Sequence, residues 1–233
     1  MRFNQPLMPG RLVRRYQRFL ADIELSNGSI VTAHCPNSGS MLSCNTPGSE
    51  VRLSYHENPN RKHPYTWEMI KVRSIWVGIN TQIPNRLVQE AILQKKMPEF
   101  IGYREVIREP KIGAHSRLDL LLQNGDQRCF VEIKNVTLVE NGVALFPDAV
   151  TARGSKHLME LMALKQQGHR AVILFLIQRY DGNYFGPASH IDPVYSAHLH
   201  EAYLNGVEVI AYRALVTPQS IELDRRIKTV FDS

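Results

Sequence analysis

The chain has 233 residues, of which 43% are hydrophobic, and it carries a formal net charge of +6 at neutral pH. This length allows one large domain or two small ones, and the longest apolar run, residues 171–177, is too short to span a bilayer. The basic start of the chain lacks the apolar run of a signal peptide, so we expect a cytoplasmic protein with no membrane partner. The positive charge favours a polyanionic partner, because each Lys or Arg placed on a phosphate releases counterions.

Arginines dominate the first 18 residues, which contain no acidic residue. Short alternating runs follow, separated by turn clusters such as Ser26-Asn27-Gly28. They predict strands over residues 19–25, 29–33, 50–55, 66–72 and 74–80. Five short strands within about eighty residues are typical of a small β-barrel of the oligonucleotide-binding (OB) type, which we place at residues 1–82.

Basic and aromatic side chains occur together in this predicted barrel. Single-stranded nucleic acids bind such surfaces by stacking bases on aromatic rings while cations follow the phosphates. The basic residues that we expect to contact nucleic acid here are Arg14, Arg15, Arg18, Arg61 and Lys62. The alternative is that Tyr16, Phe19 and Trp67 are core residues and that the arginines form a solvated face.

Small polar residues crowd the segment 34–41, HCPNSGSM. Such a loop can present backbone N–H groups and hydroxyls to a phosphate or a nucleotide, or it can merely turn the chain. Cys35 and Cys44, with His34 or His56, could form a zinc site, although their spacing matches no common zinc module. Three cysteines are too few for a disulfide framework, and we favour reduced thiols.

The strand rhythm stops near residues 80–84, where Asn85 is placed to cap a helix that runs to about residue 96. A strand over 103–109 follows, and then two strands over 118–123 and 128–134 that the Asn124-Gly125 pair joins as a hairpin. The remaining predicted elements are a helix over 155–167, a buried strand over 171–178, a helix over 193–205 and a strand over 207–212.

Helix, three strands, helix and strand is the core order of the restriction-endonuclease-like fold. The last three elements also predict a right-handed β-α-β crossover with parallel strands. We therefore expect an α+β protein of two domains, in which a nuclease-like domain with a mixed sheet, residues 83–233, follows the barrel.

The hairpin carries a carboxylate, Asp119, and thirteen residues later the sequence Glu132-Ile133-Lys134. Alternate strand residues share a face, so Glu132 and Lys134 project together while Ile133 turns into the core. This pattern resembles the D…E-x-K signature of restriction-endonuclease-like nucleases. Asp119, Glu132 and the carbonyl of Ile133 are the predicted ligands of Mg²⁺ or Mn²⁺. The alternative is a solvated Glu-Lys ion pair.

Two helices are expected to complete this site. Lys134 is the predicted water-orienting residue, and Glu90 of the preceding helix is a candidate further catalytic carboxylate or a solvated helix residue. Arg153, Lys156 and His157 cluster where the following helix begins, and its positive dipole end favours a phosphodiester there. The alternative for this cluster is a surface group paired with Glu160.

Longer segments resemble one family. HCPNSGSM (34–41), NRLVQEAI (85–92), SRLDLLL (116–122), VEIKNVTL (131–138) and FPDAVTARGSKHLMEL (146–161) are similar to the bacterial sugar fermentation stimulation protein A family. The resemblance implies an OB barrel followed by a nuclease-like domain, DNA binding without marked sequence preference, and a regulatory role in maltose metabolism. The positions of the nuclease pattern are all intact here.

Three functions stay open at this stage. The first is a largely sequence-nonspecific DNA-binding protein, and the second is a metal-dependent nuclease that acts on DNA or RNA. The third is a regulator whose loop 34–41 senses a nucleotide while DNA binding is incidental. No small-molecule cofactor is expected.

Overall fold

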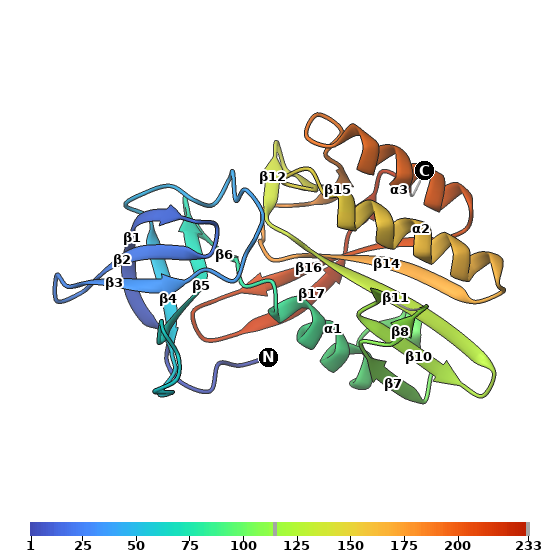
Figure 1. Cartoon of the computed structure of the whole chain (residues 1–233), viewed down its shortest axis with the longest axis horizontal. Helices are drawn as coiled ribbons and strands as arrows, with labels where there is room; N and C mark the ends of the chain where they lie inside the picture. The colour runs from blue at the N-terminus through green and yellow to red at the C-terminus, as the bar shows by residue number, and fades with distance from the viewer. Residues whose placement is uncertain (114–115, 232–233) are drawn as a thin grey trace.

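Six strands form the first sheet of the computed structural model, which describes residues 1–113 and 116–231. They are β1 (Met8–Tyr16), β2 (Leu20–Leu25), β3 (Ile30–His34), β4 (Glu50–Tyr55), β5 (Tyr65–Val72) and β6 (Ile75–Gly78). Strand β3 pairs with β2 and, in parallel, with β5, which closes β1 to β5 into a five-stranded barrel (Figure 1). The OB barrel expected from the short strands is therefore present.

Strand β1 lies in the arginine-rich segment where the sequence indicated no strand. A register shift between Leu12 and Arg14 interrupts the two-residue alternation, and this hides the strand pattern. Leu12 is buried with Trp67 in the barrel core, whereas 49% of Phe19 is exposed. Trp67 is therefore a core residue, as the alternative to base stacking predicted, whereas Phe19 is not.

A second, mixed sheet forms the rest of the core. Its strands, in the order β17-β16-β14-β11-β10-β7, are β17 (Ile221–Arg226), β16 (Glu208–Val216), β14 (Arg170–Ile177), β11 (Gln127–Val136), β10 (Leu120–Asn124) and β7 (Glu105–Arg108). Strands β11, β14 and β16 are parallel, as the predicted crossover requires. Helix α1 (Ile83–Leu93) packs on one face of the sheet, and α2 (Ala152–Gln166) and α3 (Pro193–Leu204) pack on the other.

Shorter elements connect these layers. They are the 3-10 helix η1 (Pro98–Phe100) and the strands β8 (Lys111–Ile112), β9 (Ser116–Arg117), β12 (Leu138–Glu140), β13 (Val143–Phe146), β15 (Tyr184–Pro187) and β18 (Lys228–Thr229). Among the described residues, no helix is long and apolar enough to cross a membrane.

Three predicted boundaries are corrected. Helix α1 starts at Ile83, so Asn85 lies inside the helix and is not its cap. Helix α2 starts at Ala152, because the Thr151 hydroxyl accepts a hydrogen bond from the Gly154 N–H and caps it. Asn124 pairs with Gln127, so the hairpin turn is Gly125-Asp126, with Gly125 at φ +58°.

Buried polar contacts hold the barrel against the second domain. The Gly78 N–H donates to the Gln178 carbonyl (2.9 Å), and a Cβ at Gly78 would lie 2.5 Å from the Gln178 side chain. The Arg179 side chain, 4% exposed, donates to the Thr137 carbonyl (2.7 Å) and to the Ser43 hydroxyl (2.8 Å). The relative position of the two domains is therefore fixed by specific hydrogen bonds.

Candidate active site

The hairpin brings Asp119, Glu132 and Lys134 together. Asp119 immediately precedes β10, and its carboxylate accepts a hydrogen bond from the backbone N–H of Ile133 on β11 (2.7 Å). Ile133 packs in the core cluster that includes α1, so Glu132 and Lys134 project from the opposite face of the strand, toward α2. The alternation of side chains along β11 accounts for the direction of both residues.

Glu132 is 3% exposed, and one of its oxygens, Oε1, is held by two side chains. Lys134 Nζ donates to it at 2.6 Å, and His157 Nδ1 of α2 lies in hydrogen-bond contact with it. Burial by itself would raise the pKa of Glu132, but the hydrogen bond from His157 and the charge of Lys134 outweigh burial and lower this pKa. The carboxylate is therefore ionised at neutral pH.

The second oxygen of Glu132, Oε2, is buried and has no hydrogen-bond partner among the described residues. A buried carboxylate oxygen without a partner is costly, and such atoms commonly mark a site for an ion or a water. Nearby, burial and then the charge of Glu132 raise the pKa of Asp119 to about 6. Two close carboxylates of this kind form a site that a cation would stabilise.

The donor set fits a hard divalent cation. No group of three or more His, Cys, Asp or Glu side chains able to hold a metal occurs in residues 1–113 and 116–231. A site with two carboxylates needs water, backbone or substrate oxygens to complete it, which is the usual manner of Mg²⁺ binding. The N–H and C=O of one strand residue point to the same side, so the Ile133 carbonyl faces the Asp119 side, where its N–H already bonds.

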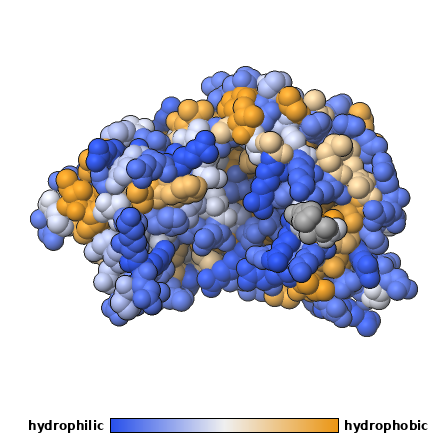
Figure 2. Space-filling view, viewed as in Figure 1, coloured by the Kyte–Doolittle hydropathy of each residue, from blue (hydrophilic) through white to orange (hydrophobic). Residues whose placement is uncertain are grey.

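The carboxylates lie in a cleft of about 480 Å³ between the barrel and the second domain. Figure 2 shows the surface hollowed between the two domains, with hydrophilic side chains around the hollow. Three arginines line the cleft: Arg18 follows β1, Arg117 ends β9 and Arg153 begins α2. The cleft thus combines a carboxylate centre with cationic walls.

Several residues predicted to contact nucleic acid lie elsewhere. Arg14 pairs with Asp22 (2.8 Å). Lys156 pairs with Glu160 (3.7 Å), which is the surface ion pair given above as the alternative to phosphate binding. Arg61 donates to the Thr66 hydroxyl (2.9 Å), and Lys62 is exposed. None of these four residues lines the cleft.

Arg15 and His157 point inward. The Arg15 guanidinium donates to the carbonyls of Asn37 (2.8 Å), Gly39 (2.9 Å) and Ser40 (3.3 Å), so it supports the loop and does not offer itself to a phosphate. The His157 ring lines the cleft and is buried against Glu132, so its contact in the structure is with the carboxylate. Of the predicted contacts, Arg18 and Arg153 are the arginines that line the cleft.

Glu90, predicted as a further carboxylate of the site, lies outside the cleft. Its carboxylate pairs with Arg86 (3.2 Å) and with the N-terminal amine (3.7 Å), and it does not line the cleft. Helix α1 contributes Asn85 in its place, whose side-chain amide donates to Asp119 at 2.6 Å. Asn85 received only a capping role from the sequence, since nothing there indicates which side of α1 faces the carboxylates.

The loop 34–41 is anchored to the second domain by Asp148. The Asp148 carboxylate accepts from the Met41 N–H (2.9 Å), and its carbonyl accepts from the Ser40 hydroxyl. A Cβ at Gly39 would lie 2.4 Å from the same carboxylate, so only glycine allows this approach. Ser38 and Gly39 line the cleft, which makes the loop one of its walls.

The cysteines do not form the conceivable zinc site. Cys35 and Cys44 are free and buried, and burial raises the pKa of both thiols, that of Cys44 to about 12. No group of three or more His, Cys, Asp or Glu side chains that could hold a metal includes them in the part of the chain that the structure describes.

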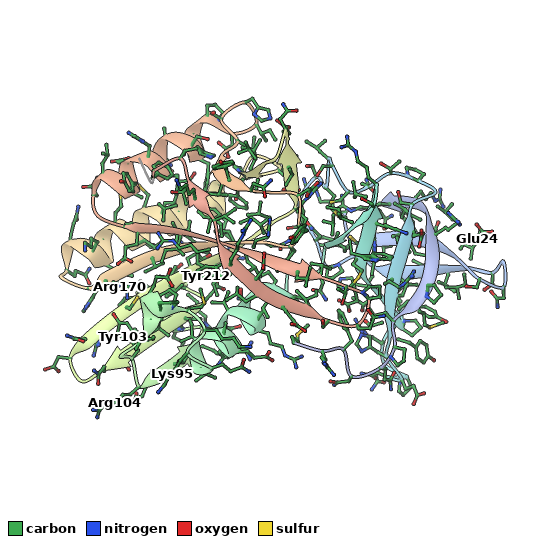
Figure 3. The ribbon with its side chains drawn as sticks, turned by 180° about the vertical axis from the view of Figure 1, so that it is seen from behind. Glu24, Lys95, Tyr103, Arg104, Arg170 and Tyr212 are labelled. Atoms are coloured by element: carbon green, nitrogen blue, oxygen red, sulfur yellow. The ribbon has the colours of Figure 1, made fainter. Side chains whose placement is uncertain are left out.

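A separate charged group lies at the end of the second sheet remote from the barrel (Figure 3). Arg170 binds both oxygens of Glu208 (2.6 and 2.7 Å), with its guanidinium 6.0 Å from the centre of the Tyr103 ring. Arg104 lies exposed near this end. This group does not belong to the cleft.

Comparisons with known proteins agree with this fold. The family model described as the SfsA N-terminal OB domain matches residues 13–79, and that of the sugar fermentation stimulation protein RE domain matches residues 82–220. The sugar fermentation stimulation protein homolog of Geobacter metallireducens is 56% identical over 99% of this chain and 100% of its own length. That of Citrifermentans bemidjiense is 55% identical over 97% and 98%.

A solved structure, SfsA of Pyrococcus furiosus in complex with Ca²⁺, matches with a TM-score of 0.90. It is 28% identical, and the match covers 98% of this chain and 97% of that one. Both domains and nearly the full length are therefore shared, and the chain belongs to the sugar fermentation stimulation protein family.

Proposed function

We propose that this protein binds nucleic acid and hydrolyses its phosphodiester bonds with a divalent cation held by Asp119 and Glu132. The observation that carries the proposal is the buried, unpartnered oxygen of Glu132 next to a second carboxylate of raised pKa. The Ca²⁺ of the Pyrococcus relative supports an oxygen-ligated cation, and Mg²⁺ or Mn²⁺ is the proposed catalytic ion.

A divalent cation would supply charge neutralisation for the phosphate and activation of water. Asp119, Glu132 and the carbonyl of Ile133 would hold it. Each of these oxygens lies on the adjoining strands β10 and β11 or just before them, so the hairpin itself sets their spacing.

Lys134 is the proposed residue that orients the attacking water. Its side chain is 14% exposed, and its ammonium lies 2.6 Å from Glu132 at the edge of the cleft. His157, bonded to the same carboxylate oxygen, is a positioning residue that keeps Oε2 of Glu132 free for the cation. Glu90 has no part in this proposal.

Arg18, Arg117 and Arg153 are the proposed phosphate contacts on the cleft walls. Cationic contacts to phosphates fix a duplex or strand without reading its bases, so binding would be largely insensitive to sequence. DNA is the proposed partner, and RNA is the alternative substrate. Affinity should fall steeply with salt, because each phosphate contact releases counterions.

The test compares plasmid, single-stranded DNA and RNA in Mg²⁺, in Mn²⁺ and in EDTA, with cleavage and mobility shift measured together. Glu132→Ala should abolish cleavage, and Lys134→Ala should abolish cleavage while it retains most binding. Glu140→Ala, which removes an exposed carboxylate outside the cleft, is the matched control. Cleavage that persists in Lys134→Ala would contradict the assignment.

A regulatory role in maltose metabolism is a second proposal, in which Arg18, Arg117 and Arg153 on the cleft walls would bind DNA without turnover. Transcripts of maltose genes would be measured in a deletion strain that carries the wild type or Lys134→Ala. Equal restoration by both chains would support regulation through binding alone, and no change on deletion would contradict regulation.

A further inference from the structure

A second cavity, of about 690 Å³, lies on the other side of the first turn of α1 from the cleft. Gln82 and Arg86 line this cavity, whereas Thr81 and Asn85 line the cleft that holds the carboxylates. The segment 81–86 is therefore a ridge between two hollows, and one helix width, ~10–12 Å, sets the scale of their separation. At a rise of about 3.4 Å per nucleotide, roughly three nucleotides of a strand would cross this ridge.

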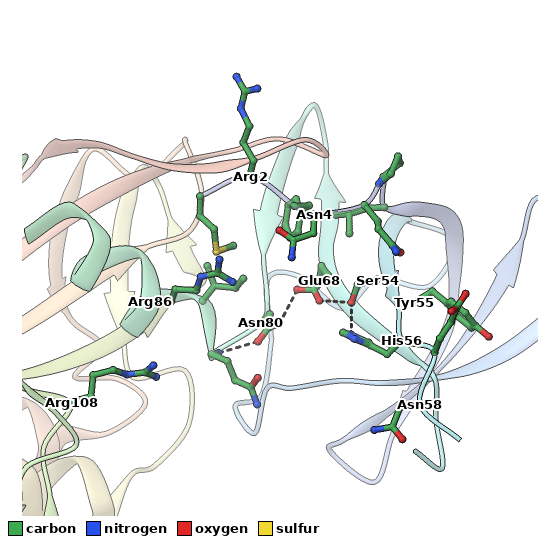
Figure 4. Close-up of a pocket in the computed structure, with 18 residues that line it drawn as sticks. Arg2, Asn4, Ser54, Tyr55, His56, Asn58, Glu68, Asn80, Arg86 and Arg108 are labelled. Atoms are coloured by element: carbon green, nitrogen blue, oxygen red, sulfur yellow. Dashed lines mark hydrogen bonds between the residues drawn. The ribbon is translucent and has the colours of Figure 1, made fainter. Parts of the chain in front are cut away.

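The second domain forms a cationic wall of this cavity. Figure 4 shows Arg86 of α1 and Arg108 of β7 on the side opposite Ser54 and His56. Arg86 pairs only with Glu90, at 3.2 Å, and keeps 58% of its side chain exposed. Arg108 is exposed, and in the part of the chain that the structure describes its side chain has neither an ion pair nor a hydrogen bond. Both guanidinium groups are therefore available to an anion.

Arg108 also lies one strand away from the proposed cation site. Strand β7 pairs Arg108 with Leu120, the residue after Asp119. The N–H of Glu109 donates to the Asp119 carbonyl (2.9 Å), which continues this pairing toward the cleft. A polyanion that passes Asp119 in the cleft and crosses the ridge therefore meets Arg108 next.

The opposite wall is the outer face of strands β4 and β5. Ser54 pairs with Thr66 across these strands, and strand alternation places His56 and Glu68 on the same face. Glu68, 6% exposed, accepts hydrogen bonds from the Ser54 hydroxyl (2.6 Å) and from the Asn80 amide (2.8 Å). The His56 ring lies 3.0 Å from the same Ser54 hydroxyl. These contacts fix the wall before any ligand enters.

Arg61 brings a further cation to this face. Its guanidinium donates to the Thr66 hydroxyl (2.9 Å) and has no carboxylate partner among the described residues. Burial and then the positive charge of Arg61 lower the pKa of His34 and of His56, so both rings are near the guanidinium. Glu57, which also lines the cavity, is exposed and forms no ion pair within the described chain. The cavity thus lies between guanidinium groups of both domains, and such groups are suited to phosphate oxygens.

We propose that the second cavity continues the nucleic-acid site, so that the bound strand extends from the cleft over the ridge and passes between Arg108 and Arg61. The inference rests on the proposed function, to which it adds the mode of binding. Phosphates are held on both sides of the carboxylates, so the bond that is cleaved is internal to the chain. Arg61, which does not line the cleft, would make here the phosphate contact that the sequence predicts.

The test is a binding titration in EDTA with two oligonucleotides of one repeated sequence, of about 4 and about 12 nucleotides, of which only the longer can span both hollows. The variant is Arg61→Gln with Arg108→Ala, because glutamine retains a donor for the Thr66 hydroxyl. The control, Arg104→Ala with Arg128→Ala, removes the same charge from exposed arginines that line neither hollow. Thermal melting checks folding, and Arg108→Ala alone replaces the double variant if the latter unfolds.

We expect the cavity variant to bind the longer oligonucleotide about tenfold or more weakly than the control, and the shorter one within about twofold. For the longer one, the slope of log K against log salt should decrease in magnitude by about 1.4, since each phosphate contact contributes about 0.7. One longer oligonucleotide should bind per protein. A duplex of about 12 base pairs should show a similar loss, because phosphate contacts do not depend on base pairing.

Losses no larger than those of the control would overturn the proposal, as would equal losses for the two lengths. Two longer oligonucleotides bound per protein would show two separate sites and would also overturn it. In Mg²⁺ or Mn²⁺, an end-labelled longer substrate should yield internal fragments, and release of single nucleotides from one end would contradict the internal mode. Absence of cleavage would remove only the proposed hydrolysis, because the binding assay contains no metal. Glu132-dependent cleavage with indifferent cavity arginines would remove only this extension of the site.

Discussion

Two buried carboxylates in one site differ in what stabilises their charge. Glu132 has a lysine and a histidine as partners, which lower its pKa, whereas Asp119 has the Ile133 N–H and the Asn85 amide. These donors and the charge of Lys134 do not offset burial and the charge of Glu132, so the pKa of Asp119 rises to about 6. Metal-free protein therefore takes up a proton at Asp119 just below neutral pH.

We expect cation affinity to follow this pKa. The folded-state pKa of Asp119, about 6, exceeds its ordinary value of 3.8, so the folded state holds the proton more tightly than the unfolded chain. Its contribution to the free energy of unfolding is fully present below about pH 4 and is lost as pH rises through about 6. A cation needs the ionised form, so affinity should fall about tenfold per pH unit below 6.

The measurement is calorimetric titration of Mn²⁺ and Ca²⁺ between about pH 5 and 8. Asp126→Asn, in the exposed hairpin turn, is the control and should follow the wild-type pH dependence. A constant affinity across this range would show that the raised pKa of Asp119 does not govern binding.

His157 should contribute to stability as well as to position. His157→Ala would leave Glu132 buried with one partner fewer, and we expect the free energy of unfolding to fall by about 3 kcal/mol. Lys156→Ala, one residue away and exposed, should change it by less than about 0.5 kcal/mol. Denaturant unfolding checks both, and equal effects would show that the His157–Glu132 contact is not stabilising.

At the scale of elements, the cleft depends on a loop of one domain fitted against a turn of the other. Gly39 approaches the Asp148 carboxylate so closely that any side chain at this position would collide with it. The same carboxylate satisfies the Met41 N–H, which fixes the loop that forms one wall of the cleft. Arg15 supports that loop from the barrel side. The wall is therefore built before substrate arrives.

A double-mutant cycle should measure the interaction between Gly39 and Asp148. Gly39→Ala is expected to cost about 2 kcal/mol through steric overlap, and Asp148→Ala a similar amount by leaving the Met41 N–H without its partner. Combined, the two changes should cost clearly less than their sum, because the smaller residue at 148 removes the collision. Additive losses in denaturant unfolding would contradict the contact.

At the scale of the whole molecule, both hollows lie where the barrel meets the second domain, so their shape depends on how the domains dock. Arg179 is the buried cation of this contact, and its guanidinium bridges Ser43 and Thr137. Asp181 binds the same guanidinium (2.6 Å) and compensates its charge. A change at Arg179 thus acts on the docking of the domains without touching the carboxylates.

We expect Arg179→Met to uncouple the two domains. The thioether side chain fills similar space but removes the guanidinium bonds to the Ser43 hydroxyl, the Thr137 carbonyl and Asp181, and it leaves Thr137 with the Ser43 hydroxyl (3.0 Å) as its donor. We expect a cost of about 3 kcal/mol. Calorimetry should then resolve two unfolding transitions, whereas we expect one for the wild type. Arg128→Met, at an exposed site, should retain the single transition. A single transition in Arg179→Met would show that other contacts suffice to couple the domains.

The sequence by itself determined the two kinds of domain and the gathering of Asp119, Glu132 and Lys134. These features depend on local rules: strand alternation places Glu132 and Lys134 on one face, and a short hairpin returns the chain to Asp119. The family resemblance extended this inference along both domains.

Only the tertiary structure decided which other side chains belong to the site. Arg14, Arg15 and Arg18 look alike in sequence, because a long flexible side chain carries its charge in whichever direction packing leaves open. Folding pairs Arg14 with Asp22, turns Arg15 into the loop and leaves Arg18 on the cleft. Glu90 and Asn85 share one helix, and the docking of α1 on the sheet selects Asn85. Such choices depend on contacts between distant segments, which no local pattern encodes.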